Sequence, residues 1–187
     1  MLDDLKKACE ILRKGGVILY PTDTIWGIGC DATREDAVKR IYEIKRRSDS
    51  KSMLTLLDSP DKLDRYVDDL PEIAFNLIEC SNKPLTIIYS GAKNIARNLI
   101  APDGTIGIRI TKEEFSQKLC RQFGKPVVST SANFSNEPAP ANFSEINNEI
   151  FRLVDYVVKY KSDETQKSKP SSIIRLESSG VIKIIRE

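Results

Sequence analysis

The sequence contains no histidine among its 187 residues. This absence excludes Ser-His and Cys-His nucleophile pairs, and it excludes zinc sites built on imidazole. Any chemistry must therefore rest on Lys, Arg, Asp, hydroxyl groups and the backbone. Such groups suit reactions that need the positioning of reactants and the stabilisation of charge.

Long apolar runs and cysteine motifs are also missing. No stretch approaches the ~18 apolar residues of a membrane span, and residues 1–7 lack the basic start and apolar run of a secretory signal. The four cysteines are widely separated, without a Cys-x-x-Cys pair, so we expect reduced, buried thiols and neither a disulfide framework nor a zinc knuckle. These features predict a cytoplasmic protein that does not associate with membranes.

The bulk composition is that of one globular unit. Hydrophobic residues make up 40% and charged residues 30% of the chain, which is enough to bury one core. Neither an internal repeat nor an interdomain linker is visible, so we expect a single domain over residues 1–187. The net charge is only +2, and any basic binding site must therefore be local.

Helical and strand patterns interleave without strict alternation, which predicts an α/β fold with a mixed, twisted sheet and flanking helices. Helices are expected at residues 2–12, 37–44, 113–123 and 145–151, with short ones from Pro60 and Pro71. Strands are expected at residues 17–20, 53–57, 86–89, 106–110, 127–129, 154–158, 173–176 and 181–185.

Local signals mark several helix ends. Gly15-Gly16 would end the first helix, and Thr33 with Asp36 resembles a capping box for the second. Ser144 is expected to cap the helix near residues 145–151. Residues 161–169 are poor in apolar side chains and are either a solvated loop or a flap over a site.

Two polar segments each follow a predicted strand. Residues 20–30, Tyr-Pro-Thr-Asp-Thr-Ile-Trp-Gly-Ile-Gly-Cys, form a loop that could present hydroxyl and backbone groups to a small polar ligand, or a turn with packing glycines. Residues 128–133, Val-Ser-Thr-Ser-Ala-Asn, end in hydroxyl and amide donors suited to an anion. Ser and Asn are equally common in turns that end strands.

Basic residues gather at two places. Residues 39–51 hold six Lys or Arg residues against two carboxylates, and Lys45 and Arg47 straddle a helix end that we expect to face solvent. From there they could reach one phosphate chain, or simply pair with the negative end of the helix dipole. Arg109, within Gly-Ile-Arg-Ile, is either a surface residue or a bidentate clamp for a carboxylate.

In this order and spacing the motifs resemble the YrdC family, also called TsaC, the threonylcarbamoyl-AMP synthases. The resemblance rests on Tyr20-Pro21-Thr22-Asp23-Thr24, Lys45-x-Arg47, Pro84-Leu85-Thr86, Gly107-Ile108-Arg109, Ser131-x-Asn133 and Pro170-Ser171-Ser172-Ile173. It implies an α/β domain around a concave, positively charged cavity. It also implies an enzyme that makes L-threonylcarbamoyladenylate and pyrophosphate from L-threonine, bicarbonate and ATP.

The same resemblance implies roles for particular residues. The residues implied in catalysis are Lys45, Arg47, Ser131 and Asn133. Those implied in ATP binding are Arg47, Lys51, Thr105, Ser131, Asn133 and Arg186. Those implied in threonine binding are Thr24, Arg109, Ser129 and Ser171, with Arg109 on the carboxylate.

Cofactors and partners follow from the resemblance and from the residue types. No carboxylate cluster suggests a metal site, so we expect Mg²⁺ to arrive on ATP, and we expect no organic prosthetic group. The adenylate would pass to a separate tRNA threonylcarbamoyl-transferase complex, which makes N6-threonylcarbamoyladenosine at position 37 of ANN-decoding tRNAs. Direct contact with tRNA or double-stranded RNA is a further expectation.

The chain departs from the family pattern at Asn82-Lys83-Pro84, Ser48 and Leu56. Two other functions are compatible with the motifs. One is an RNA-binding module without catalysis, although the chain has a single Trp and no basic-aromatic interleaving. The other is a carbamoyl-adenylate former resembling the YrdC-like domain of hydrogenase maturation proteins.

Overall fold

The computed structural model describes residues 1–46, 53–163 and 170–187. Within these residues nine strands form one sheet in the order β7-β1-β2-β6-β3-β5-β4-β8-β9. The strands are β1 (Ile18–Tyr20), β2 (Gly27–Gly29), β3 (Leu54–Leu57), β4 (Leu85–Tyr89), β5 (Ile106–Ile110), β6 (Val127–Ser131), β7 (Tyr156–Val157), β8 (Ser172–Leu176) and β9 (Ile182–Arg186).

The sheet is mixed, as expected from the sequence. β1 runs parallel to β7, β3 to β5 and β4 to β8, while the other neighbours are antiparallel. β6 lies between β2 and β3, with Ser131 opposite Gly27 and Ser129 opposite Leu54. This register brings the hydroxyl-rich end of β6 between the loop before β2 and the start of β3.

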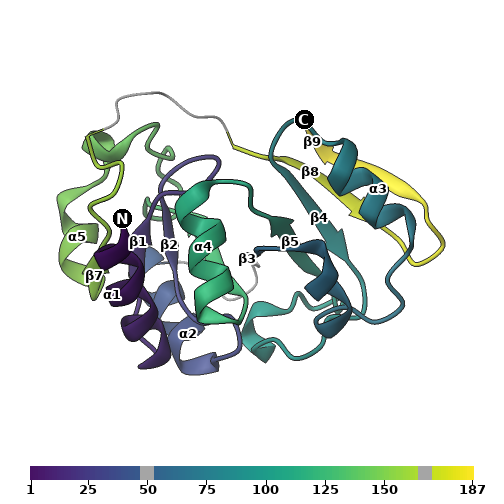
Figure 1. The fold of residues 1–187 in the computed structure, drawn as a ribbon, viewed down its shortest axis with the longest axis horizontal. Coiled ribbons are helices and arrows are strands. Elements are labelled where there is room, and N and C mark those ends of the chain that lie inside the picture. The colour runs from purple at the N-terminus through teal and green to yellow at the C-terminus, as the bar shows by residue number, and fades with distance from the viewer. Residues whose placement is uncertain (47–52, 164–169) are drawn as a thin grey trace.

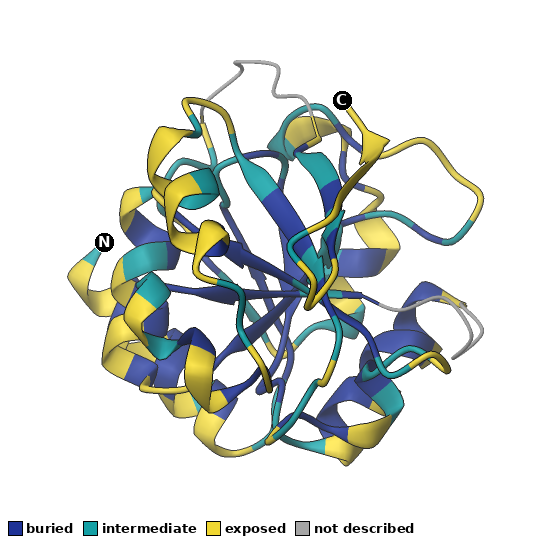
Figure 2. Cartoon of the chain, turned by 90° about the vertical axis from the view of Figure 1, so that its right-hand side faces the viewer, coloured by how far each residue is buried: buried dark blue, intermediate teal, exposed yellow. Residues whose placement is uncertain are grey.

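Helices flank the sheet, and most strands are buried beneath them (Figures 1 and 2). α1 contacts α4, β1 and β7, and α4 also contacts β3, while α3 lies at the β8–β9 end of the sheet (Figure 1). The helices are α1 (Leu2–Arg13), α2 (Glu35–Lys45), α3 (Ile73–Cys80), α4 (Glu114–Phe123) and α5 (Asn148–Leu153). The predicted fold class is therefore confirmed. The predicted end of the first helix is also confirmed, because Gly15 follows α1 with φ +82°.

Two predicted helix caps are wrong. Thr33 donates its hydroxyl and its backbone N–H to the Asp31 carboxylate, so it does not cap α2, while Asp36 pairs with Arg34. The cap predicted at Ser144 is formed instead by Asn147, whose side-chain oxygen accepts from the Glu149 N–H at the start of α5. α2 begins after Arg34 without a side-chain cap, whereas at α5 an asparagine with similar local chemistry lies nearer to the true helix start.

Strand β2 was not predicted, because residues 27–29 are Gly-Ile-Gly and glycine is depleted in strands. The structure explains the choice of glycine. A Cβ atom at Gly29 would lie 2.5 Å from the Val128 carbonyl oxygen and 2.6 Å from the Tyr20 ring. Only a residue without a side chain allows β1, β2 and β6 to approach so closely.

None of the helices in the described part of the chain is long and apolar enough to cross a membrane.

Candidate functional site

A hollow of about 290 Å³, here called the site hollow, opens where β2, β3 and β6 meet the segment before β8. Its polar lining comes from elements far apart in the sequence. The polar residues are Thr24, Arg109, Ser129, Thr130, Ser131, Ser171 and Arg186, and Ile25, Gly27, Met53, Leu54, Ala139, Pro170 and Ile173 complete the wall.

All four residues implied in threonine binding line this hollow, and all four are buried. The exposed fractions are 6% for Thr24, 3% for Arg109, 5% for Ser129 and 2% for Ser171. Residues this deeply buried are fixed by packing, so their polar groups are presented to the hollow in one arrangement.

The site hollow carries positive charge. Arg109 and Arg186 line it, and none of its described lining residues is a carboxylate. Arg186 is held in place because its Nε and Nη2 atoms donate to the Ser171 carbonyl oxygen at 3.0 and 2.7 Å. The combination of cations and hydroxyl groups fits a ligand with negative charge.

Arg109 has an acidic partner outside the site hollow. Its Nε atom lies 3.1 Å from Asp23 Oδ1, and the exposed fractions of the two side chains are 3% and 11%. Neither atom makes an aligned hydrogen bond, so the contact is an ion pair. Burial raises the pKa of Asp23 and lowers that of Arg109, while the attraction between the two charges opposes both shifts.

The loop after β1 is folded by its own hydroxyl groups. The Thr22 hydroxyl donates to the Ile25 carbonyl at 2.8 Å, accepts from the Thr24 N–H and lies 3.1 Å from the Thr24 hydroxyl. This turn holds Thr24 against the hollow. Gly27 lets the chain after this turn lie close to β6, because a Cβ atom at Gly27 would be only 3.2 Å from Ser129 Oγ.

A second, mostly apolar hollow of about 470 Å³ adjoins the first and shares Met53, Leu54 and Ile173 with it. Thr105, implied in ATP binding, lies in its wall and is 5% exposed. Its hydroxyl donates to Asp103 Oδ1 at 2.7 Å. Ser131 and Arg186, the other described residues implied in ATP binding apart from Asn133, line the site hollow itself.

The expectation that Lys45 faces solvent is wrong. It is 2% exposed, and its Nζ atom donates to the carbonyl oxygens of Ser131 and Asn133, the latter at 2.7 Å. The side chain reaches across to the end of β6 because the last turn of α2 packs against that strand's continuation. Its ammonium group therefore shapes the polypeptide next to the site hollow.

Asn133 stabilises the same turn and does not line the site hollow. Its Nδ2 atom donates to the carbonyl oxygens of Phe134 at 3.0 Å and Glu137 at 2.7 Å. Arg47 and Lys51, together with Ser48 and residues 164–169, lie outside the described residues. Their predicted roles, and the choice between loop and flap for residues 161–169, stay predictions.

The sequence motifs predict no role for Asp23, which lies within Tyr-Pro-Thr-Asp-Thr. A usable signal was present, because an arginine in an apolar strand needs a counter-charge when it is buried. The sequence does not say which carboxylate supplies it, because Asp103 and Glu113 lie closer to Arg109 along the chain than Asp23 does.

The fold and the site hollow define a class: a mixed α/β protein with a buried, cationic, hydroxyl-lined site at the ends of its central strands. The chain belongs to the Sua5/YciO/YrdC family, whose model, described as telomere recombination, matches residues 10–187. The resemblance seen in the sequence motifs is thereby confirmed.

Individual relatives agree with this assignment. A threonylcarbamoyl-AMP synthase of Pseudoalteromonas translucida is 34% identical over 154 residues, covering 81% of this chain and 82% of the relative. The crystal structure of E. coli YciO is 29% identical with a TM-score of 0.82, and the match covers 98% of this chain and 88% of that one.

A further similar structure is P. abyssi Sua5 complexed with L-threonine, with a TM-score of 0.82 and 24% identity. The match covers 92% of this chain and 50% of that one, so this chain spans about half the length of that protein. At this identity the likeness concerns the fold alone.

Proposed function

We propose that this chain is an enzyme, an ATP-dependent nucleotidyltransferase that makes L-threonylcarbamoyladenylate and pyrophosphate from L-threonine, bicarbonate and ATP. The observation that carries the proposal is the burial of Thr24, Arg109, Ser129 and Ser171 around one cationic hollow. The name of the Pseudoalteromonas relative supports the same reaction.

The amino acid would bind through its carboxylate and its hydroxyl. Arg109 is the buried cation of the hollow and offers a planar fork of N–H donors that matches a carboxylate. Thr24, Ser129 and Ser171 supply hydroxyl groups that can pair with the threonine side chain. This leaves the amino group free to condense with bicarbonate, releasing water and forming the carbamate.

ATP would lie across the two adjoining hollows, with Thr105 in the apolar one and Ser131 and Arg186 near the phosphates. The carbamate oxygen then attacks the α-phosphorus, and pyrophosphate leaves. Such transfers depend mainly on alignment and charge neutralisation, which cations and hydroxyl groups provide. We propose that Arg47 and Lys51 contact phosphates, whereas Lys45 and Asn133 hold the turn after β6.

Mg²⁺ would arrive on the nucleotide. No group of three or more Cys, Asp or Glu residues in the described chain is arranged to hold a metal ion, and the phosphates of ATP are the natural oxygen ligands for Mg²⁺. We further propose that the adenylate is used in the cytoplasm by a tRNA threonylcarbamoyl-transferase complex for modification at position 37, with direct RNA contact as an additional property.

A pyrophosphate-release assay separates the candidate functions. The protein is incubated with ATP, Mg²⁺ and bicarbonate, without tRNA, and with L-threonine, carbamoyl phosphate or neither. We expect release only with threonine. Release with carbamoyl phosphate alone would indicate the chemistry of hydrogenase maturation, and an absolute requirement for tRNA would contradict the proposal.

A further inference from the structure

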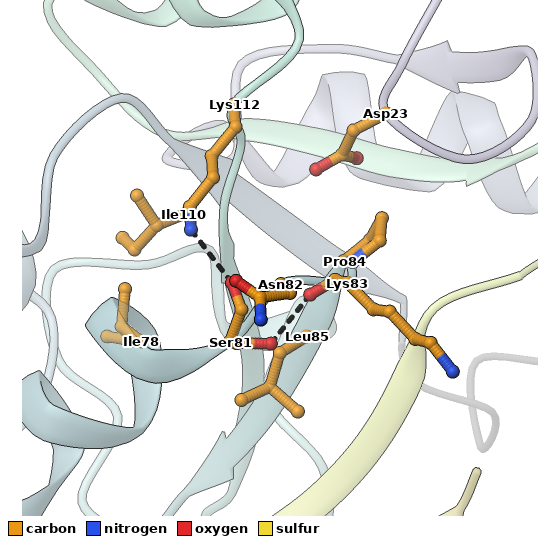
Figure 3. Close-up of a pocket in the computed structure, with 9 residues that line it drawn as sticks. All are labelled: Asp23, Ile78, Ser81, Asn82, Lys83, Pro84, Leu85, Ile110 and Lys112. Carbon is orange, nitrogen blue, oxygen red and sulfur yellow. Dashed lines mark hydrogen bonds between the residues drawn. The ribbon is translucent and has the colours of Figure 1, made fainter.

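Asp23 lies next to the site hollow but is not part of its wall. It does not line the site hollow, yet its Oδ1 atom is 3.1 Å from the Nε atom of Arg109, which does. Asp23 instead lines a hollow of about 120 Å³, here called the rear hollow, together with Ile110 and Lys112 (Figure 3). It also lines a hollow of about 200 Å³ that shares Thr24 and Ile25 with the site hollow. Because Arg109 and Ile110 are adjacent in β5, their side chains point to opposite faces of the sheet.

The loop and strand connections give Asp23 a fixed position. Figure 3 shows its carboxylate extending from the loop after β1 toward the segment 81–85 at the start of β4. Backbone N–H groups of Lys112 and of Asp23 itself act to lower the pKa of the Asp23 carboxyl, against the larger effect of burial. The Lys112 side chain is engaged elsewhere, because its Nζ atom donates to the Ser81 carbonyl at 2.9 Å.

The contact occupies one particular edge of the guanidinium group. A guanidinium has five N–H donors, and a partner at Nε leaves the terminal nitrogens for a second carboxylate. Although the contact is an ion pair and not an aligned hydrogen bond, its charge attraction holds the Nε edge of the group toward Asp23. Arg109 thus enters the site hollow already oriented.

We propose that Asp23 is a positioning residue that orients the Arg109 guanidinium for bidentate binding of the amino-acid carboxylate. This inference rests on the proposed function. It assigns Asp23 no contact with the substrate and no proton transfer. Its influence should therefore appear only for ligands that carry a carboxylate, and only while residue 109 is arginine.

The test measures binding of L-threonine and of L-threoninol, in which the carboxylate is replaced by an alcohol, by isothermal titration calorimetry. Asp23→Asn keeps the shape and removes the charge. We expect it to weaken threonine binding by about tenfold, as for directly coupled pairs, and to leave threoninol binding unchanged. In an Arg109→Lys background the Asp23→Asn change should have no further effect on threonine.

Asp155→Asn is the matched control. Asp155 also pairs with an arginine, Arg40, but lies away from both hollows, so its variant should bind threonine like the parent. Asp23→Ser is a second variant for the case in which Asp23→Asn does not fold, with folding checked by circular dichroism.

Three results would overturn the positioning role: unchanged threonine binding in Asp23→Asn, equal loss for threonine and threoninol, or full additivity with Arg109→Lys. Loss of the fold in both Asp23 variants would also overturn it, because Asp23 would then be a structural residue. If the parent itself does not bind threonine, the proposed function fails and this inference falls with it.

Discussion

Arg109 and Lys45 are buried to almost the same extent, with 3% and 2% of their surface exposed, but they are held by different chemistry. The Nε atom of Arg109 pairs with the Asp23 carboxylate, and Arg109 lines the site hollow. Lys45 donates to the backbone carbonyl oxygens of Ser131 and Asn133. Under the proposed function, one cation would recognise a ligand and the other would shape the backbone beside it.

The side-chain types fit these two tasks. A guanidinium is a planar fork that can hold a partner on one edge and still present parallel donors to a carboxylate. An ammonium is a compact group whose three donors converge on nearby oxygens. Exchanging the two types should therefore damage different properties of the protein.

The largest expected effect concerns substrate choice. Arg109 cannot discriminate between amino acids, because every amino acid has the carboxylate that it would bind. Discrimination must then come from the hydroxyl groups of Thr24, Ser129 and Ser171. Serine lacks one methyl and should be used roughly 10–200-fold less well than threonine, while valine leaves polar groups unpaired and should be rejected by about 10⁴-fold. Competition assays of adenylate formation measure this order, and valine matching serine would contradict the hydroxyl contacts.

Arg109→Lys should follow, with threonine kcat/KM lowered by about 100-fold, since an ammonium cannot reproduce a bidentate charged contact. ATP binding should change little, because Arg109 is assigned to the amino acid. Steady-state kinetics with each substrate varied in turn would show the split. An equal loss for both substrates would mean that Arg109 supports the hollow as a whole.

Lys45→Met tests the other cation and should act on stability first. Removal of the ammonium takes the donor from the Asn133 carbonyl and one of two donors from the Ser131 carbonyl, which also accepts from the Asn133 N–H. This loss should lower the free energy of unfolding by about 1–3 kcal/mol. Urea unfolding measures this. Lys39→Met on the same helix, whose side chain is 71% exposed, is the control and should change stability by less than about 0.5 kcal/mol. Equal free energies of unfolding for the two variants would contradict the role of Lys45 in stabilising the backbone beside the site.

The smallest expected effect concerns Asp4, a carboxylate held mainly by hydrogen bonds instead of a guanidinium. Burial alone would raise its pKa, but donation from the Tyr156 hydroxyl at 2.7 Å and from the N–H groups of Lys159 and Tyr160 leaves the pKa lowered. A lowered pKa stabilises the fold above the ordinary pKa of an aspartate, and this contribution is lost as the pH falls through the lowered value.

Asp4→Asn should therefore cost about 1 kcal/mol at neutral pH, and the gap from the parent should close below about pH 4. Urea unfolding at a series of pH values measures both. A gap that stayed constant across that range would show that Asp4 contributes its two acceptor oxygens, and not its charge.

The sequence was sufficient for the fold class and for most of the site. Apolar periodicity located α1, α4 and most strands, and the motifs gathered Thr24, Arg109, Ser129 and Ser171, which the structure brings to one hollow. Local patterns succeed where the cause is local, as at the Gly15 stop.

Apart from the two helix caps, the errors have a common physical origin in contacts between distant residues. Lys45 was expected in solvent because helix-end reasoning sees only its own turn, whereas its partners lie 86 and 88 residues further along the chain. Strand β2 was missed because its glycines are required by the approach of β6, not by strand propensity. Asp23 could be identified as the partner of Arg109 only once β5 and the loop after β1 were placed together.

The most direct test of the central claim is the identity of the product. The purified protein is incubated with ATP, Mg²⁺, L-threonine and ¹³C-bicarbonate, and the mixture is analysed by mass spectrometry. We predict a threonylcarbamoyl-adenylate that is one mass unit heavier than the product from unlabelled bicarbonate, accompanied by pyrophosphate and formed without tRNA. ATP left intact under these conditions, or an adenylate without the labelled carbon, would contradict the account.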